Sequence, residues 1–436
     1  MNPRKIVKKL FPKQVFQKIE PYGHMAEAMI AQAKYHFPAK NINVVGITGT
    51  DGKTTTCSLV ASVLRAGGYR VGVLTTAYID YGDGRGEQTN ITNLTTGNAF
   101  ALNRIISQMR ANQVDWIVLE TSSHALNQHR IWGIPITIAI MTNMSQEHLD
   151  YHGTFTNYQR AKEILFKMCN RNKHGLQTGV VNADDATADS FAKRIKNSIS
   201  YGINKGELRA QDLITDLNGN RFNVKTDKLD HAFSTHLLGR FNTYNALSAI
   251  ATGKVLGLSP EVIQRGLDTV QSVEGRMMPL DVGQPYKVLI DYAVTPGALE
   301  SVLGTIRDIA GKGKVHIVFG ATGDRDKTKR PAMGEVTSRL ADKVYLTDDE
   351  TYTEDASSIQ SQVLSGASTK NKHKIIQFDD RQDAIASAIS SARAGDIIVI
   401  SGIGHQTTRN MGGKKIKWSD LEITKQLLQK SLESKA

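Results

Sequence analysis

Apolar residues in this chain form short runs that alternate with helical patterns of apolar and polar positions. In the first half, the runs cover residues 44–47, 70–75, 116–119 and 136–142, and helical patterns cover 54–66 and 98–112. In the second half, the runs cover 287–291, 315–319, 343–346, 374–378 and 397–400, with helical patterns such as 296–310 and 383–394. This alternation is typical of parallel strands joined by crossover helices. The chain is therefore predicted to be an α/β protein with two mainly parallel sheets.

The stretch between the two series has a different pattern. Residues 201–238 carry shorter alternating runs that indicate antiparallel strands, and helical patterns follow over 242–256 and 260–271. The second series begins after residues 272–274, where we place a domain boundary. We predict a short N-terminal segment over residues 1–40, a central domain over 41–272 and a C-terminal domain over 273–436.

Composition limits the class of protein without naming a function. The 436 residues are 40% hydrophobic and 22% charged, which is ordinary for a globular protein. No apolar run approaches the roughly 20 residues of a membrane span, and the N-terminus lacks the apolar core of a signal peptide. Cys57 and Cys169 lie in helical patterns away from any Cys/His cluster, so we expect core residues, with no disulfide and no zinc site. A soluble, cytoplasmic protein is expected.

The formal net charge of +12 suits nucleic acid, an anionic membrane or an acidic metabolite, and composition does not choose among them. Most of this charge is expected on solvated surface. The clearest concentration is in residues 1–18, where Lys and Arg are interleaved with apolar residues. This segment is compatible with a membrane surface or with a frayed or docked basic terminus, and Pro12 interrupts any long amphipathic helix there.

A glycine-rich segment between the first apolar run and the first helical pattern indicates phosphate binding. Glycines at 46, 49 and 52 allow backbone N–H groups to converge on phosphate oxygens, and the start of the following helix adds a positive dipole end. A turn of this kind without a ligand is the alternative, but nothing structural demands Lys-Thr after the last glycine. The predicted residues for ATP binding are Gly49, Thr50, Asp51, Gly52, Lys53, Thr54 and Thr55.

Further polar residues follow buried runs or lie on helices. Glu120 ends a buried strand, where a carboxylate can reach a Mg²⁺ ion held by the Thr54 hydroxyl, although an acid at this place is often a helix cap or a surface residue. His148 and His152 follow another strand closely, and we take His148 as a possible metal ligand and His152 as structural or substrate-facing. Lys162 lies on an amphipathic helix and, taken alone, is an ordinary exposed lysine.

The segment Gly-Thr-Asp-Gly-Lys-Thr-Thr over 49–55 resembles the ATP loop of the Mur ligases and the folylpolyglutamate synthetases. The string over 318–334, Val-Phe-Gly-Ala-Thr-Gly-Asp-Arg-Asp-Lys-Thr-Lys-Arg-Pro-Ala-Met-Gly, decides between them. With the strings over 120–126, 148–154 and 182–185, it identifies the chain as a member of the Mur ligase family, similar to the MurE type. The resemblance implies a P-loop central domain, a Rossmann-like C-terminal domain and an ATP-dependent amide-bond ligase of peptidoglycan synthesis.

The resemblance also implies roles for individual residues. It makes Lys162 a lysine that CO₂ carbamylates into an anionic ligand, so that the metal ligands are Thr54, Glu120, His148 and carbamylated Lys162. Asn242 and Asn245 are expected to meet the adenine, and an N-cap and a polar helix face are the alternative explanation for them. Arg276 is expected to reach the γ-phosphate and Asp291 the ribose. The implied catalytic residues are Lys53, Lys162, His148 and Arg276.

The substrates implied are UDP-N-acetylmuramoyl-L-Ala-D-Glu and an amino acid, and the protein is expected to be a monomer without a nucleic-acid partner. Contacts to the muramyl peptide are expected from Thr95, Thr96, Ser122, Gln128 and Arg130, and contacts to the amino acid from Asp349, Tyr352, Gly402 and Gln406.

Two departures alter this expectation. Only a short segment precedes the loop, so UDP recognition is expected to be weakened or differently built. Residues 349–352 read Asp-Glu-Thr-Tyr where diaminopimelate enzymes have Asp-Asn-Pro-Arg, and 402–406 read Gly-Ile-Gly-His-Gln where they have Gly-Lys-Gly-His-Glu. A different amine is therefore expected, with L-lysine, ornithine and diaminopimelate all left open.

Three other functions compete with this one. A folylpolyglutamate- or cyanophycin-type ligase fits the string over 318–334 poorly. A non-catalytic ATP-binding subunit of a cell-wall complex is suggested by the short front segment, but Lys53, Glu120, His148 and Lys162 are all present. A nucleic-acid-dependent ATPase would use the basic charge, yet no strand motif of aromatic and basic residues occurs.

Overall fold

The fold is taken from a computed structural model that describes residues 13–90, 95–226 and 229–433. The first described element is α2 (Lys13–Lys34), which contains Pro21 and packs against α4. Sequence reasoning did not predict this helix, and Pro12 lies outside the described residues. No helix of the described part is long and apolar enough to cross a membrane.

The first sheet has eleven strands in the order β11-β10-β9-β8-β7-β6-β1-β5-β2-β3-β4. The strands from β9 to β2 in this order, which are β9, β8, β7, β6, β1, β5 and β2, all run parallel to one another. At one edge β3 and β4 continue the sheet from β2 in antiparallel pairs, and at the other edge β10 and β11 continue it from β9 in the same way. The antiparallel pairing of β9, β10 and β11 confirms the strands expected over residues 201–238. The bounds are β1 (Asn43–Thr48), β2 (Val71–Leu74), β3 (Tyr78–Asp80), β4 (Gln88–Thr89), β5 (Trp116–Glu120), β6 (Ile136–Met141), β7 (Thr178–Asn182), β8 (Asn197–Gly202), β9 (Leu208–Asp216), β10 (Gly219–Thr226) and β11 (Leu229–Thr235).

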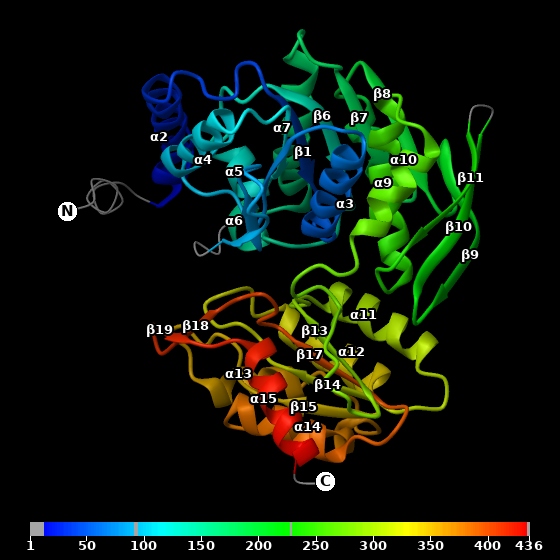
Figure 1. Cartoon of the computed structure of the whole chain (residues 1–436). Helices are drawn as coiled ribbons and strands as arrows, with labels where there is room; N and C mark the ends of the chain where they lie inside the picture. The colour runs from blue at the N-terminus through cyan, green and yellow to red at the C-terminus, as the bar shows by residue number, and fades with distance from the viewer. Residues whose placement is uncertain (1–12, 91–94, 227–228, 434–436) are drawn as a thin grey trace.

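Helices cover both faces of this sheet, because successive residues of a strand point to opposite faces. Val45 and Ile47 of β1 belong to the core under α3, α9 and α10, whereas Val44 belongs to the core under α4 and α7. Figure 1 shows the two helical layers. The bounds are α3 (Lys53–Ala66), α4 (Ala99–Ala111), α5 (Ser123–Asn127), α6 (Leu149–His152), α7 (Phe155–Arg171), α8 (Ala188–Ala192), α9 (Arg240–Val255) and α10 (Pro260–Thr269).

The second sheet has six strands in the order β12-β13-β17-β14-β15-β16, parallel except for β12. Its strands are β12 (Met278–Pro279), β13 (Lys287–Asp291), β14 (Val315–Phe319), β15 (Lys343–Leu346), β16 (Ile375–Gln377) and β17 (Ile397–Ser401). A separate hairpin joins β18 (Thr408–Met411) to β19 (Lys414–Lys417). The helices are α11 (Pro296–Ile309), α12 (Lys329–Leu340), α13 (Ala356–Leu364), the 3₁₀ turn η1 (Lys372–Lys374), α14 (Arg381–Ser391) and α15 (Asp420–Glu433).

The α/β class and the two mainly parallel sheets are thus confirmed, and Cys57 and Cys169 are buried free thiols as expected. The hairpin β18–β19 and the helix α15 were not predicted. The last strand of the first sheet ends at Thr235 and the first strand of the second begins at Met278. The predicted boundary at 272–273 falls between them, and the domain limits themselves remain a prediction.

Candidate active site

The glycine-rich loop between β1 and α3 has a backbone that only glycine accommodates at two positions. Gly49 has φ +149°, and a Cβ there would lie 1.8 Å from Thr142 Oγ1. Gly52 has φ +76°, and a Cβ there would lie 2.5 Å from Asn245 Oδ1. Such distances are far inside van der Waals contact, so these glycines allow neighbouring segments to approach the loop.

The end of β6 braces the loop from the side. Asp51 donates its backbone N–H to Asn143 Oδ1 at 2.9 Å, and Asn143 Nδ2 donates to the Asp51 carbonyl at 3.2 Å. Thr142 Oγ1 donates to the same carbonyl at 2.7 Å, and Thr50 donates its N–H to the Asn143 carbonyl at 2.9 Å. Sequence reasoning missed Thr142 and Asn143, although both stand directly after an apolar run, where site residues of parallel sheets gather.

Lys53 opens α3 and turns back over the loop, donating from Nζ to the Thr50 carbonyl at 2.6 Å. The other end of the loop is tied to α9, since Thr56 Oγ1 donates to Asn245 Oδ1 at 3.1 Å. Asn245 Nδ2 donates in turn to Asn242 Oδ1 at 2.8 Å. Both asparagines are buried, and these hydrogen bonds connect the start of α3 to α9. This structural role does not depend on a contact with the nucleotide.

The Glu120 carboxylate lies beside the first turn of α3 and is held by three donors. Thr54 Oγ1 donates to Oε2 at 2.9 Å, the Thr76 N–H donates to the same oxygen at 2.9 Å, and Thr76 Oγ1 donates to Oε1 at 3.0 Å. Thr55, the next residue of α3, is buried. The expected proximity of Thr54 and Glu120 is therefore present, and Thr76 is a contributor that sequence reasoning missed.

This arrangement fits a hard divalent cation such as Mg²⁺. A hydroxyl and a carboxylate meet at one point next to the loop, and Mg²⁺ is commonly bound by one or two carboxylates together with substrate phosphates and water. Among the described residues, no group of three or more His, Cys, Asp or Glu side chains has metal-binding geometry. Protein side chains alone therefore supply only part of a coordination shell.

Lys162 of α7 is buried, in contrast with the exposed residue that the sequence taken alone suggested. Its Nζ donates to the Gly49 carbonyl and lies 4.6 Å from the centre of the Tyr158 ring. Burial, reinforced by the positive charge of Lys53, holds the pKa of Lys162 well below its usual range. The amine is therefore far more readily neutral than a surface lysine.

The two histidines of the α6 segment have different surroundings. His148 has φ +56° and a side chain 42% exposed, with Nε2 3.7 Å from Glu147 Oε2 and its ring 4.8 Å from that of His124. His152 is buried, and its Nε2 lies 3.0 Å from Ser123 Oγ. The expectation of a structural or substrate-facing His152 agrees with this contact.

The residues expected to meet the muramyl peptide form one cluster beside Glu120. Thr96 Oγ1 donates to the Glu120 carbonyl at 3.1 Å and accepts from the Ser122 N–H at 3.3 Å, while Arg130 Nη1 donates to the Thr96 carbonyl at 3.2 Å. Two neighbouring contacts are the hydrogen bond of 2.8 Å between Thr95 Oγ1 and Thr76 Oγ1 and the one that Gln128 Nε2 donates to Tyr151 Oη at 3.0 Å. These contacts join Thr95, Thr96, Ser122 and Arg130 around Glu120, whereas Gln128 contacts Tyr151.

The second sheet presents a cation to the loop. Arg276 lies 4.7 Å from the centre of the Tyr292 ring, and its charge opposes the burial that raises the pKa of Asp51. Asp291 is buried and accepts from the Met277 N–H at 2.8 Å and the Ala293 N–H at 2.7 Å, and burial raises its pKa. Arg276 therefore lies beside Tyr292, just before the second sheet, and its charge acts on Asp51 of the loop, while Asp291 holds the backbone of the residue after Arg276.

His405 is a further residue that sequence reasoning did not single out. It is buried with both ring nitrogens lacking a hydrogen-bond partner, and its ring lies 5.1 Å from that of Tyr292. Burial and the nearby Arg276 lower the pKa of His405 to about 3, so the ring is neutral at physiological pH. A buried ring with unused donor and acceptor positions is suited to a polar substrate group.

The expected amino-acid pocket lies around Asp349. Asp349 is buried with Oδ2 unpartnered, and a Cβ on Gly402 would lie 2.2 Å from that oxygen. Gln406 Nε2 donates to Tyr292 Oη at 3.3 Å, which links this pocket to the Arg276 region. Tyr352 has φ +50° and its Oη lies 3.4 Å from Glu350 Oε2.

One acid of this region is already committed to other partners. Glu354 forms ion pairs with Arg330 at 3.0 Å and Lys327 at 2.9 Å, which lower its pKa to about 2. The charge of Glu354 is therefore neutralised by two cations of the string over 318–334. Asp349 and Glu350 remain as the acids of the pocket.

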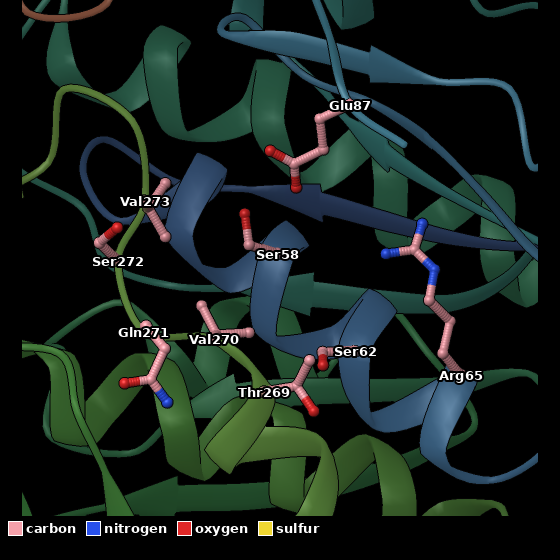
Figure 2. A pocket seen from close by; sticks show the side chains of 9 residues that line it. All are labelled: Ser58, Ser62, Arg65, Glu87, Thr269, Val270, Gln271, Ser272 and Val273. Carbon is pink, nitrogen blue, oxygen red and sulfur yellow. The ribbon is translucent and has the colours of Figure 1, made fainter. Parts of the chain in front are cut away.

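A cavity of about 280 Å³ lies apart from this site, between α3 and the segment that follows α10. Figure 2 shows Ser58, Ser62 and Arg65 of α3 on one side and residues 269–273 on the other, with Glu87 near the opening. Arg65 is paired with Asp80 at 2.8 Å. No residue predicted for substrate or nucleotide lines the cavity, so we do not include it in the candidate site.

The fold and the site together define a P-loop enzyme of the ligase type, with phosphate-binding elements on one sheet and a cation and an acidic pocket on another. Comparison with known proteins makes this assignment specific. The Mur ligase middle domain matches residues 47–253, and the Mur ligase glutamate ligase domain matches residues 275–404.

Individual relatives extend over most of the chain. The UDP-N-acetylmuramoyl-L-alanyl-D-glutamate–2,6-diaminopimelate ligase of Bacillus velezensis is 36% identical over 402 residues, covering 91% of this chain and 80% of that protein. Ligase 1 of the same name from Clostridium acetobutylicum is 35% identical over 428 residues, covering 97% and 85%. A solved structure of a diaminopimelate ligase of this name superimposes with a TM-score of 0.64 at 29% identity, covering 95% of this chain and 83% of that chain. The chain belongs to the Mur ligase family.

Proposed function

We propose that this protein is an ATP-dependent ligase that adds a diamino acid to UDP-N-acetylmuramoyl-L-Ala-D-Glu in peptidoglycan synthesis. It acts as a monomer in the cytoplasm, where a nucleotide-linked precursor and ATP are both available. The observation that carries the proposal is the meeting of Thr54 and Glu120 at 2.9 Å beside a glycine loop that also contacts the buried Lys162. The residues expected to bind the muramyl peptide lie next to Glu120, so the carboxylate of that substrate would lie beside the nucleotide site.

The proposed reaction has two steps. An oxygen of the terminal D-glutamyl carboxylate attacks the γ-phosphorus of ATP, forming an acyl phosphate and releasing ADP. The incoming amine then attacks the acyl carbon, forming the amide, while inorganic phosphate leaves and the amine loses a proton. Thr54 and Glu120 would hold a Mg²⁺ ion, which would reduce the repulsion between the carboxylate and the triphosphate. Lys53 and Arg276 stabilise the charge that develops on the transferred phosphoryl group.

We further propose that Lys162 is carbamylated. Its neutral Nζ attacks CO₂, a C–N bond forms and one proton is released, so that a buried amine becomes an anion with two oxygen atoms. The lowered pKa of Lys162 supports this step, because only the neutral amine has the lone pair that attacks CO₂. The carbamylated Lys162 and His148 would hold a second Mg²⁺, with the carbamate offering oxygen ligands.

The amine that we propose has a cationic side chain and no distal carboxylate, as in L-lysine or L-ornithine. Tyr352 stands where an arginine fork would hold a distal carboxylate, and the nearest guanidinium, that of Arg325, lies 5.3 Å from the centre of the Tyr352 ring. Asp349 and Glu350 are the carboxylates of this pocket. Oδ2 of Asp349 has no hydrogen-bond partner among the described residues; burial raises the pKa of Asp349, and the charges of Arg381 and Arg409 oppose that rise. A terminal ammonium satisfies that oxygen, whereas a carboxylate repels it.

The test is phosphate release from ATP with UDP-N-acetylmuramoyl-L-Ala-D-Glu and, in turn, L-lysine, L-ornithine and diaminopimelate, with the products weighed by mass spectrometry. We expect release and a matching tripeptide mass with L-lysine or L-ornithine. Release with diaminopimelate alone would keep the ligase and reject the proposed amine. ATP binding without release for any amine would reject the ligase in favour of a non-catalytic ATP-binding subunit.

A variant pair separates the amine from the rest of the reaction. Tyr352→Arg together with Glu350→Asn restores the residues of the diaminopimelate enzymes at both positions, and we expect it to raise kcat/KM for diaminopimelate and lower it for L-lysine. Glu354→Gln is the matched control, because its carboxylate is engaged with Arg330 and Lys327. If Glu354→Gln, and not the double variant, changed the ratio of kcat/KM for the two amines, the amine would not bind beside Tyr352 and Glu350.

A further inference from the structure

The outward face of α2 is apolar, which is unusual for a helix on the surface of a protein. Tyr22, Met29 and Ile30 are 71%, 45% and 61% exposed, and Phe37, just beyond the helix, is 47% exposed. The positions 22, 26, 29 and 33 fall on one side of a helix, and Ala26 and Ala33 are exposed as well. We call the surface formed by Tyr22, Ala26, Met29, Ile30, Ala33 and Phe37 the α2 face.

The opposite side of α2 attaches the helix to the protein with small and polar residues. Ala28 and Ala31 are fully buried with Ala99 of α4, and Gln32 Nε2 donates to the Trp132 carbonyl at 3.1 Å. The usual pattern places large apolar residues inward and polar residues outward. Among the described side chains of α2, Tyr22, Met29 and Ile30 point outward, so burial against the described residues does not explain them.

Charge around the α2 face is positive. Glu20 and Glu27, the two acids of the helix, lie 3.8 and 3.6 Å from the ring nitrogens of His24 on the buried side. Lys34 and Lys40 are exposed, and Arg110 of α4 donates to the His36 carbonyl at 3.4 Å, which places a third cation at this end. The sequence before Glu20 contains six lysines and arginines and no acid: Arg4, Lys5, Lys8, Lys9, Lys13 and Lys18.

We propose that the α2 face docks on the surface of an anionic lipid bilayer. Apolar side chains enter the boundary of the headgroups and acyl chains, and the basic residues are attracted to anionic lipid headgroups, so two weak signals combine into stable association. Figure 1 shows α2 beside α4 at the outer edge of the first sheet, away from the second sheet.

Charge complementarity favours lipid over a second copy of this chain. Two copies that met through the α2 face in a symmetric dimer would bring Lys34, Lys40 and Arg110 of both copies to one interface, and like charges at an interface oppose association. An anionic bilayer provides the opposite charge along a flat surface.

The proposal is tested with the full chain in a vesicle sedimentation assay. We expect binding to vesicles of phosphatidylcholine and phosphatidylglycerol, little binding to phosphatidylcholine alone, and weaker binding as salt is raised. Tyr22→Ser, Met29→Ser and Ile30→Ser combined should lower the partition coefficient at least tenfold. The control combines Ile214→Ser, Leu217→Ser and Ile416→Ser, which removes three exposed apolar residues elsewhere and should bind like wild type.

Three results would overturn the proposal. These are no binding of wild type to anionic vesicles, equal binding of the two triple variants, and equal binding to neutral and anionic vesicles. Light scattering after size exclusion adds a fourth: a dimer that the α2 variant converts to a monomer would assign the face to a second copy. Circular dichroism and unchanged phosphate release show that the α2 variant is folded, since none of its residues belongs to the candidate active site.

Discussion

At the scale of single residues, the candidate site contains a lysine in a place that disfavours its charge. Lys162 is buried beside Lys53, and its ordinary partners are a carbonyl and an aromatic ring. Burial of an ionisable group that lacks a close counter-ion destabilises the folded state. Functional sites commonly contain such groups, because replacing them would stabilise the folded state but remove the activity.

We predict that Lys162→Met raises the melting temperature at neutral pH in CO₂-free buffer while it abolishes phosphate release. The folded-state pKa of Lys162 is lowered, so between that value and about 10.4 the unfolded chain binds one more proton than the folded chain. The free energy of unfolding of the wild type therefore rises with pH across this window, and the methionine variant lacks this rise. The gain should be largest at the low-pH end and correspond to about 2–4 °C per kcal/mol.

Calorimetry at several pH values measures both curves, and a constant difference between them would contradict the argument. Equilibration with ¹³C-bicarbonate provides an independent readout. A carbamate carbon signal should appear in the wild type and be missing in Lys162→Met.

Thr76 is predicted to position Glu120 for metal binding. Thr76→Val removes the hydroxyl donor to Oε1 and keeps the backbone donor to Oε2, so the carboxylate loses one of its three restraints. Loss of a group that orients a metal ligand commonly lowers metal affinity or activity about 10–100-fold. We expect the Mg²⁺ concentration for half-maximal phosphate release to rise at fixed ATP. An unchanged Mg²⁺ requirement with a lower kcat would instead assign Thr76 to substrate binding.

At the scale of elements, the loop depends on residues that the chain brings from far away. We predict that Gly49→Ala abolishes nucleotide binding, because its Cβ would lie 1.8 Å from Thr142 Oγ1 and push β6 from the loop. Gly304→Ala in α11 is the control, since a Cβ there meets nothing within 4 Å and alanine favours a helix. Titration with a fluorescent ATP analogue measures both variants. Nucleotide affinity within twofold of wild type for Gly49→Ala would mean that the loop tolerates the displacement.

The same elements show what sequence reasoning reached. The glycine spacing and the strand-ending Glu120 are local patterns, and the resemblance of short strings led to Lys162, Arg276 and the muramyl-peptide cluster. Thr76 and Asn143 were missed because their roles depend on the strand order β6-β1-β5-β2, which places three chain segments beside one loop. Hydrophobic periodicity gives the strands but not their order.

The elements α2 and β18–β19 were missed for another reason. The outward face of α2 is apolar and its inward face is small and polar, so its pattern does not resemble that of a surface helix. The strand β19 consists of exposed residues, three of them lysines, and therefore lacks the apolar run by which the other strands were predicted.

At the scale of the whole molecule, the two sheets divide the work of the site. The glycine loop, Glu120 and Lys162 belong to the first sheet and its helices, whereas Arg276 and the Asp349 pocket belong to the second part of the chain. Binding of the ATP phosphates therefore requires only the first part of the chain. Transfer of the phosphoryl group to the substrate carboxylate, followed by attack of the amine, requires both parts. Domain closure is the movement that such a division suggests, and scattering should show compaction when an ATP analogue and the muramyl peptide are added together.

Arg276 tests this division directly. We predict that Arg276→Ala leaves the affinity for an ATP analogue within a few-fold of wild type, because the loop contacts come from the first part of the chain. The rate of phosphate release should fall about 10²–10³-fold, which is typical when one donor to a developing negative charge is removed. Arg276→Lys keeps the positive charge but loses the planar fork and the stacking on Tyr292, so it should restore only part of the rate. Equal losses of affinity and rate in Arg276→Ala would mean that the arginine binds the ground state, and the two parts would then form one binding site for ATP.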